Sequence, residues 1–362
     1  MSPTLAWARR RATAGNRTPA LAGPAPALTT WRRGLQITLG LIWLLDAALQ
    51  YQPYMFTGAF GREVIAPTAE SSPAFIAGPV SWTARLIAQH PAAWNAGFAT
   101  IQLLLAVGLL WRPTVRLALA ASVAWALGVW WLGEGAGGML AGGASPLTGA
   151  PGAALLYVPL ALVLWPGRQD RDLDASPGAS VATAGPLGAV APRVVWALLW
   201  AGLGYLALQP ANRAAGSVSA MLTDMKDGEP GWVAAMDNAL ARALAGHGTA
   251  VAVVLAILCT AAVLAIALPP RLMRIGVIAA ALAGTLIWVA QDFGEVFTGQ
   301  GTDPNSGLLL IVLAAAFWPL AARRPAQPSG TRPISGHAAD LADPATTATA
   351  AARGSERGES AP

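Results

Sequence analysis

One acidic residue lies inside an apolar run of the chain that is long enough to cross a membrane. Asp46 stands between leucine and alanine residues, six positions before Gln52. Placing a charged side chain at the centre of a bilayer costs about 2.5–3.5 kcal/mol of free energy on insertion scales. An acid at that depth is therefore expected to serve a function or to be neutralised by a hydrogen-bond partner or a proton. Asp46 either carries protons or binds a cationic solute, or it is protonated or hydrogen-bonded and faces Gln50 or another helix.

Three further acids follow tryptophans at the ends of two other apolar runs. Glu134 comes three residues after Trp131, and Asp292 and Glu295 come shortly after Trp288. Glycines are frequent around these acids, and glycine permits positive φ angles and close backbone approach. The loops are therefore expected to fold back and to form an acidic outer cavity together with the intramembrane aspartate. The alternative is that they carry ordinary solvated acids.

Two histidines occupy corresponding places in the chain. His90 and His247 each lie just before an apolar run and five residues after an arginine. The imidazoles either meet as metal or haem ligands or as a proton relay, or they cap helix starts or lie at the level of the lipid headgroups. Two histidines do not make a zinc site, so no metal is predicted.

Aromatic and polar residues inside the apolar runs suggest further sites. Trp125, Trp130 and Trp131 crowd one run. They either line a pocket for a flat ligand such as a quinone ring, which is a possible cofactor, or they serve packing. Gln102 and Cys259 lie in the middle of two runs and are predicted to mediate helix packing. No second cysteine exists, so no intramolecular disulfide is possible.

The composition is that of a membrane protein. Of the 362 residues 55% are hydrophobic and 11% are charged, whereas a soluble domain carries roughly a quarter charged residues. Apolar runs that cross ~30 Å of hydrocarbon must be helical, because lipid offers no partner to an exposed backbone N–H or C=O. The sequence predicts an all-α, polytopic integral membrane protein with eight transmembrane helices, at residues 35–51, 94–111, 114–132, 151–166, 193–209, 248–268, 272–290 and 306–321.

Basic residues alternate between the loops and indicate an orientation. Eighteen of the 23 lysines and arginines fall in the two termini and every second loop, and five fall in the opposite loops. Both termini are therefore predicted to be cytoplasmic (N-in/C-in). The preference for arginine and alanine is typical of a bacterial genome of high GC content, which indicates the bacterial plasma membrane. The net charge of +5 comes from tails and loops, so the lipid bilayer is the expected partner and nucleic acid is not.

The chain repeats itself with a shift of 157 residues, which places Trp43 on Trp200 and Pro113 on Pro270. Such self-similarity predicts two structural repeats, each with an even number of spans and so with the same orientation. The long outer loops after the first span of each repeat lie on the outer bilayer surface or pack on the bundle as lids. The predicted parts are four-helix units at 34–166 and 192–321 in a tandem 4+4 repeat, a cytoplasmic linker at 167–191, and disordered cytoplasmic tails at 1–33 and 322–362.

A four-span unit with a long outer loop, a basic inner turn and a glycine-rich outer loop resembles the DoxX-like membrane proteins. The resemblance implies a membrane component of a quinone-linked or redox-stress complex with a redox-enzyme partner. Two other functions stay open, a small-solute or ion transporter and a non-catalytic membrane scaffold. No phosphate loop, nucleophile triad or haem-attachment motif is present, so no catalytic residue is assigned. The stretches that carry the resemblance are 39–53 (LGLIWLLDAALQYQP), 111–116 (WRPTVR), 131–143 (WLGEGAGGMLAGG) and 288–307 (WVAQDFGEVFTGQGTDPNSG).

Overall fold

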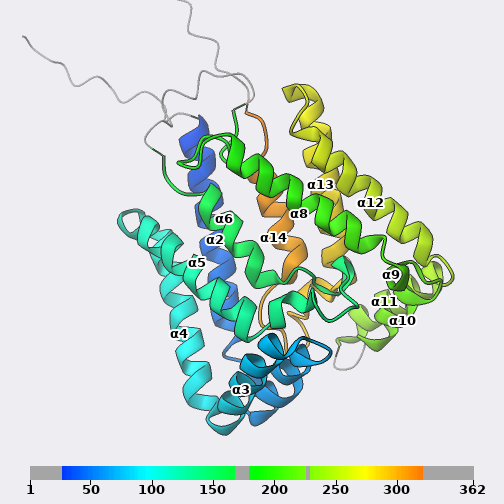
Figure 1. Ribbon diagram of the computed structural model, residues 1–362. Helices are drawn as coiled ribbons and strands as arrows, with labels where there is room; N and C mark the ends of the chain where they lie inside the picture. The colour runs from blue at the N-terminus through cyan, green and yellow to red at the C-terminus, as the bar shows by residue number, and fades with distance from the viewer. Residues whose placement is uncertain (1–26, 168–178, 226–228, 321–362) are drawn as a thin grey trace, which may run out of the picture. The chain divides into compact units, whose positions relative to one another are not determined.

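The computed structural model describes residues 27–167, 179–225 and 229–320. Helices account for 76% of these residues and no strand occurs among them, which confirms the predicted all-α class (Figure 1). Residues 1–26, 168–178 and 321–362 lie outside the described residues; they include most of the predicted N-terminal tail at 1–33, part of the predicted linker at 167–191 and all of the predicted C-terminal tail at 322–362.

Long helices alternate with short helical segments in both halves of the chain. The first half contains α2 (Ala27–Leu49), η1 (Pro53–Phe56), η2 (Phe60–Ile65), η3 (Ala66–Ala69), α3 (Ala74–Gln89), α4 (Pro91–Leu110), η4 (Arg112–Thr114), α5 (Val115–Leu132), η5 (Gly135–Gly138), η6 (Pro146–Thr148) and α6 (Ala153–Val163). The second half contains α8 (Val190–Ala207), α9 (Pro210–Arg213), α10 (Ser217–Asp224), α11 (Gly231–Leu244), α12 (Gly248–Ala265), α13 (Pro270–Ala290), η7 (Asp292–Gly294) and α14 (Asn305–Ala316).

Five of the described helices are long and apolar enough to cross a membrane: α4, α5 with the turn before it, α8, α12 and α13. Helix α2 has 23 residues but carries Arg32, Arg33 and Asp46. Helices α6 and α14 have 11 and 12 residues, about 17 Å at 1.5 Å per residue, and are thus shorter than the predicted runs. In α6 the backbone supplies a reason, because Gly152 has a φ of 104° directly before the first helical residue.

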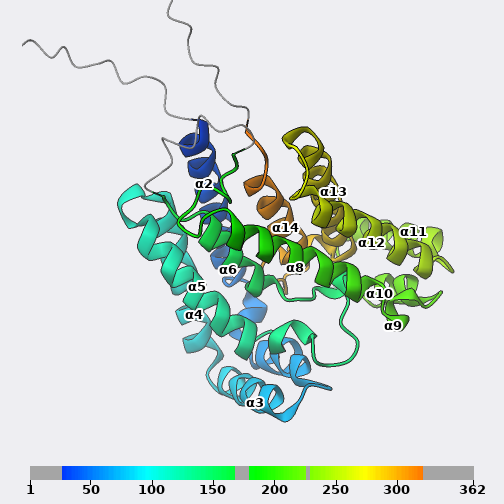
Figure 2. The same ribbon diagram turned by 45° about the horizontal axis from the view of Figure 1, so that its top comes forward.

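The two halves share one hydrophobic core. In the first half α2 lies beside α4 and α5 beside α6, and in the second half α12 lies beside α8 and α13, which packs on α14. Helix α14 also contacts α6 and α2, which joins the halves (Figure 2). The buried indoles of Trp196 and Trp200 belong to this core. The indole N–H of Trp196 donates to the carbonyl of Ala262 at 2.7 Å, as a buried polar group requires.

The first helix begins within the segment that the sequence assigns to the N-terminal tail. Helix α2 starts at Ala27, so the tail prediction extends seven residues too far. Arg32 is 2% exposed and donates to a linker carbonyl at 3.1 Å. Arg33 donates to the carbonyls of the last two residues of α4 at 2.8 and 2.5 Å. Arginine binds carbonyl oxygens that a helix end leaves free, and hydropathy alone does not reveal this role.

Elements recur at corresponding positions of the two halves. The pairs η1 and α9, η2 and α10, α3 and α11, and α4 and α12 each begin 157 residues apart. The turns after α5 and α13 also correspond, since residues 135–138 have φ angles of 55–64° and residues 292–295 have φ angles of 48–82°. Four consecutive residues in the left-handed region are uncommon. The two halves therefore share an order and spacing of elements.

Helix α3 packs against the first half along an apolar face. Ile76, Val80, Ala84 and Ile87 are at most 4% exposed, and the helix contacts η2, η3, α4 and α5. Trp82 is 54% exposed. Of the two arrangements considered for the long loop, this packing corresponds to a lid.

Candidate ligand-binding cavity

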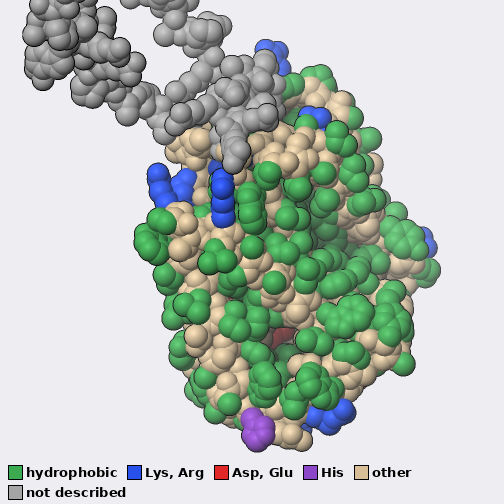
Figure 3. All heavy atoms as spheres, turned by 60° about the vertical axis from the view of Figure 1, so that its left-hand side comes forward, with side chains coloured by type: hydrophobic (Ala, Val, Ile, Leu, Met, Phe, Trp, Pro, Cys, Tyr) green, Lys and Arg blue, Asp and Glu red, His purple; other side chains and the backbone are tan. Residues whose placement is uncertain are grey.

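A cavity of about 900 Å³ opens in the first half of the chain. Its walls come from α2, α3, α4, α5 and α6, and the loop before α14 contributes one side. Figure 3 shows a hollow in a largely apolar face with an acidic side chain at its floor. The volume lies in the range of small-molecule sites, roughly 300–1,000 Å³.

Asp46 of α2 forms a buried hydrogen bond in the cavity wall. Its side chain is 1% exposed, and its Oδ2 accepts a hydrogen bond of 2.5 Å from the hydroxyl of Tyr157 in α6. The ring of Tyr157 lies 4.2 Å from the ring of Trp43 between centroids. The second oxygen, Oδ1, is buried without a hydrogen-bond partner among the described residues. The carboxylate is thus only half satisfied, and it offers an acceptor to the cavity.

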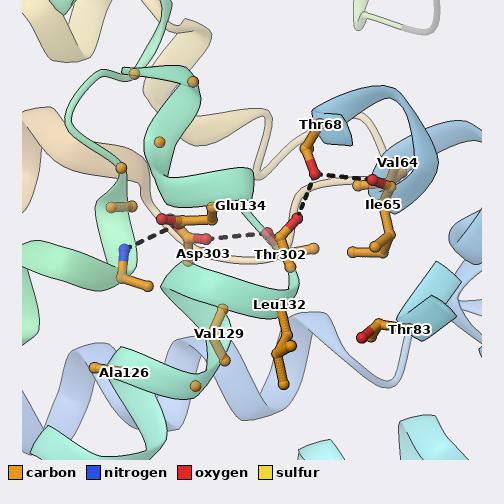
Figure 4. A pocket seen from close by; sticks show the side chains of 18 of the residues that line it. Val64, Ile65, Thr68, Thr83, Ala126, Val129, Leu132, Glu134, Thr302 and Asp303 are labelled. Carbon is orange, nitrogen blue, oxygen red and sulfur yellow. Dashed lines mark hydrogen bonds between the residues drawn. The ribbon is translucent and has the colours of Figure 1, made fainter. Parts of the chain in front are cut away.

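Two more carboxyl groups lie next to each other in the wall (Figure 4). Glu134 follows α5, and its Oε1 accepts the N–H of Ala154 in the first turn of α6 at 2.9 Å, where the helix dipole favours negative charge. Asp303 comes from the loop before α14 and accepts the N–H of Asn305 at 2.7 Å and the hydroxyl of Thr302 at 3.0 Å. An acid of the second half therefore completes a site on the first.

The surroundings raise the pKa values of these two loop acids. Burial, followed by the charge of Asp303, raises the pKa of Glu134 to about 8, although backbone N–H groups of Ala154 and Ala153 act in the opposite direction. Burial also raises the pKa of Asp303. Asp303 lies within electrostatic reach of both Asp46 and Glu134. Acids that repel one another at close range favour a cation between them.

The buried polar atoms without a partner around the cavity are mainly acceptors. Among the described residues these acceptors are Asp46 Oδ1, Glu134 Oε2, Gln50 Oε1 and Gln102 Oε1, and one donor, Trp125 Nε1, joins them. All five residues line the cavity. An ionised carboxylate only accepts hydrogen bonds, so a ligand that satisfies this wall has to donate.

Aromatic rings make up much of the remaining wall. Phe98 lies between Trp94 and Trp125, with centroid distances of 6.1 and 5.6 Å. No Lys, Arg or His occurs among the described residues that line the cavity. Ring faces and carboxylates both attract positive charge. The aromatic lining residues are Trp43, Phe60, Trp82, Trp94, Phe98, Trp125 and Tyr157.

The structure divides the predicted acidic site between two places. Asp46, Gln50 and Glu134 line the cavity. Asp292 is 1% exposed and lies in η7 beside acids of its own half, and Glu295 is exposed. The expectation of one shared outer cavity therefore holds for part of the set only, because Asp292 packs toward α11 instead.

His90 and His247 lie apart. They are the N-cap residues of α4 and α12, and both are exposed. Figures 1 and 2 place these helices on opposite sides of the described helices. The Nδ1 of His247 lies 2.8 Å from the carbonyl oxygen of Ala245. Both histidines thus lie at helix starts but form no side-chain capping hydrogen bond, and the structure does not bring them together as a ligand or relay pair.

The three tryptophans considered for a flat ligand also separate. Trp125 lines the cavity, whereas Trp130 and Trp131 are not among its lining residues. The indole N–H of Trp130 donates to the carbonyl of Pro151 at 2.8 Å. Gln102, predicted to serve packing, lines the cavity, and Cys259 is fully buried in the core.

Two residues that line the cavity, Tyr157 and Asp303, are not predicted as site residues from the sequence. Tyr157 is one of only four tyrosines. A buried phenol within an apolar helix needs a hydrogen-bond partner, and this need could have linked Tyr157 to the intramembrane Asp46. Asp303 gives no such signal, because it lies in a polar loop and reaches the cavity through the packing of α14 on α6.

Comparison with known proteins identifies no relative. No protein family, no curated protein and no solved structure matches the chain. The resemblance to DoxX-like proteins therefore rests on the sequence stretches alone.

Proposed function

We propose that this protein is a membrane-embedded binding protein for lipophilic organic amines, which it holds in their protonated form in the acidic, aromatic cavity. The observation that carries the proposal is a pair of carboxylate oxygens, Asp46 Oδ1 and Glu134 Oε2, buried without a hydrogen-bond partner in a cavity whose described lining contains no basic side chain. A primary ammonium group donates three hydrogen bonds and brings the opposite charge. Binding of this kind is the first step of the small-solute transport that the sequence leaves open.

The aromatic wall accommodates the remainder of such a ligand. A cation within about 6 Å of a ring centroid gains roughly 0.5–2 kcal/mol from the ring face. In this proposal the ammonium group binds to Asp46 and Glu134, and an aromatic or aliphatic body lies along Phe98 and Trp125, all of which line the cavity. The hollow lies in a largely apolar face (Figure 3), which suits a ligand that arrives from the lipid.

The membrane arrangement that accompanies this function is the tandem 4+4 repeat with eight spans and both termini in the cytoplasm of a bacterium. The recurrence of elements 157 residues apart supports the repeat, and the alternation of basic residues supports the orientation. Helices α6 and α14 are short, but irregular backbone is tolerated at membrane depth where protein surrounds it. Most residues of both helices are buried.

A quinone-binding component of a redox complex, with a redox-enzyme partner, is the second candidate and follows from the DoxX-like resemblance. One observation favours it, because the indole N–H of Trp125 is a buried donor without a partner on the cavity wall. The surplus of unpartnered oxygens weighs against it, since quinone carbonyls accept hydrogen bonds and do not donate them.

Ligand binding to the purified protein in detergent tests the proposal by isothermal titration calorimetry. The ligands are an arylalkyl primary amine, the alcohol of the same shape, and a short-chain ubiquinone. We expect the amine to bind and the alcohol to bind at least tenfold more weakly. Asp46→Asn should weaken amine binding at least tenfold, because truncating one partner of a buried charge pair costs about 2–5 kcal/mol.

The matched control is Asp224→Asn, since Asp224 is exposed and does not line the cavity. This variant should bind the amine as the unmodified chain does. Equal affinity for amine and alcohol would rule out the amine proposal. Ubiquinone binding that persists in Asp46→Asn, without amine binding, would favour the redox candidate. Absence of binding by all three would leave the scaffold alternative.

A further inference from the structure

Three acids of the second half converge at a point away from the cavity. Glu229 lies just before α11, Asp237 lies within α11, and Asp292 lies in η7 after α13. One carboxylate oxygen from each lies within 4.8 Å of the others. The three do not line the cavity, so this cluster is separate from the site described above.

The burial of these acids distinguishes them from an ordinary acidic surface. Asp237 is 0% exposed and Asp292 is 1% exposed. All six carboxylate oxygens of the three residues are buried. The side chains of Asp237 and Asp292 lie within hydrogen-bond reach of each other, and no other residue in the described part of the chain bonds to the three acids. An unpaired buried charge is among the most costly arrangements in a protein. The cluster therefore requires either bound protons or a cation.

The neighbouring charges increase this requirement. The carboxyl groups of Asp237, Glu229 and Glu295 act on Asp292, and those of Asp237 and Glu295 act on Glu229. Every charged neighbour that acts on these two groups is thus an acid.

We infer that Glu229, Asp237 and Asp292 bind one divalent metal ion of the class that prefers oxygen ligands, represented by Ca²⁺ and Mn²⁺. Carboxylate oxygens without nitrogen or sulfur ligands favour Ca²⁺, Mg²⁺ or Mn²⁺ over zinc or copper. Oxygens that bind Ca²⁺ at about 2.3–2.6 Å lie up to roughly 5 Å apart across the ion, and these three oxygens all lie within 4.8 Å of one another. The gap suits a single ion and not an organic cation.

The ion would link three segments of the second half. It would hold the turn after α13 against α11 and against Glu229, which lies two residues before α11. That turn contains Asp292, Phe293 and Glu295, each with a φ between 48 and 58°, which is an unfavourable backbone region for residues other than glycine. Metal ligation at Asp292 would help to compensate for this strain.

The first half provides an internal comparison. The 157-residue shift places Ser72, Val80 and Gly135 on the three acids. None of these residues can ligate a metal through a carboxylate, so the first half has no equivalent site. Conversely, the shift places Leu203 on Asp46, so the second half lacks the equivalent of that cavity acid. The site therefore belongs to one half only, and a cavity variant serves as its control.

Metal binding to the full-length protein in detergent tests the inference. The protein is treated with a chelator, freed of it by gel filtration and titrated with Mn²⁺, while free Mn²⁺ is followed by electron paramagnetic resonance. We expect one Mn²⁺ per chain, displacement by Ca²⁺, and a higher melting temperature with either ion. Asp292→Asn should weaken Mn²⁺ binding at least tenfold, whereas Asp46→Asn should leave it unchanged.

Glu229→Gln provides a second variant in case Asp292→Asn does not fold, because Glu229 is only partly buried. It should also weaken Mn²⁺ binding at least tenfold while the protein still elutes as a folded species. The inference is overturned if the chelator-treated protein takes up no stoichiometric Mn²⁺ or Ca²⁺ at millimolar concentration. It is equally overturned if both Asp292→Asn and Glu229→Gln bind Mn²⁺ as tightly as the unmodified chain.

Discussion

The hydroxyl of Tyr157 donates a 2.5 Å hydrogen bond to Oδ2 of Asp46, although the two residues lie 111 positions apart in the sequence. The pair links α2 to α6 on the wall of the cavity. The other oxygen of Asp46 remains free to accept. Tyr157 therefore fixes the orientation of a carboxylate whose second half is available to a ligand.

Tyr157→Phe should weaken amine binding about tenfold or more. The variant keeps the ring and its contact with Trp43, but the carboxyl group of Asp46 that would pair with the bound amine loses its hydroxyl donor. Hydrogen bonds to charged groups contribute about 1.5–3 kcal/mol. Calorimetric titration of the amine measures the loss.

The control for this variant is Tyr205→Phe, because Tyr205 is 68% exposed. It should bind the amine normally. In the Asp46→Asn background, Tyr157→Phe should cause no further loss, since residues that act through one contact are not additive. Additive losses would show that Tyr157 acts independently of Asp46.

Binding of a permanently charged cation should strengthen as the pH rises toward 8. Glu134 has a pKa raised to about 8 by burial and by Asp303, so below that pH it is mostly protonated and neutral. A cation binds the ionised form of Glu134 better and must displace the proton. This displacement lowers the affinity by up to about tenfold for each pH unit below the pKa. Titration with a lipophilic quaternary ammonium ion from pH 6 to 9 measures this dependence, because the charge of the ligand does not change.

Glu134→Gln should bind this ion more weakly at pH 9 and should flatten the dependence of affinity on pH below pH 8. Asp303, whose pKa is also raised and whose charge acts on Glu134, keeps a residual dependence. Affinity that falls with rising pH in the unmodified chain would contradict the assignment of Glu134 as an acceptor for the cation.

The helices could be predicted from the sequence, but their ends and some of their roles could not. Each predicted apolar run coincides at least partly with a helix, because lipid and core both demand runs of apolar residues. Gly152 is an example of a helix end that could not be predicted. It lies inside the predicted span at 151–166, but its φ of 104° is not helical, and α6 begins only after it. Arg33 is an example of a role that could not be predicted, because its hydrogen bonds to the end of α4 depend on the partner helix and not on its own neighbours in sequence.

The cavity could be predicted only in part for a similar reason. Asp46 is conspicuous because a charge within an apolar run is expensive. Asp303 and the cluster of Glu229, Asp237 and Asp292 are acids in polar segments, which are unremarkable in sequence. Only the packing of α14 on α6, and of η7 near α11, brings them into buried places.

Gly128→Phe should abolish amine binding without unfolding the protein. Gly128 lies within α5 on the cavity wall, and a Cβ there would meet no atom within 4 Å. A benzyl group would therefore enter the cavity and occupy the space of the ligand. Gly128→Ala is the matched control, and it should keep binding and raise stability by about 0.5–1 kcal/mol, as alanine does over glycine in a helix. Amine binding that survives Gly128→Phe would place the ligand elsewhere.

The number of spans can be tested through parity at two engineered cysteines. Ser71→Cys and Ala215→Cys each place a thiol at an exposed loop position, and the only native cysteine, Cys259, is fully buried. Of the helices between the two positions, α4, α5, α6 and α8 coincide with predicted spans. If all four helices cross the membrane, both thiols lie on the outer side, and a membrane-impermeant maleimide added to intact spheroplasts labels both positions.

Helix α6 has only 11 residues. If it does not cross the membrane, three crossings remain between the two thiols, which then lie on opposite sides. Labelling of one position alone would thus contradict the parallel 4+4 arrangement, and labelling of neither would reverse its orientation.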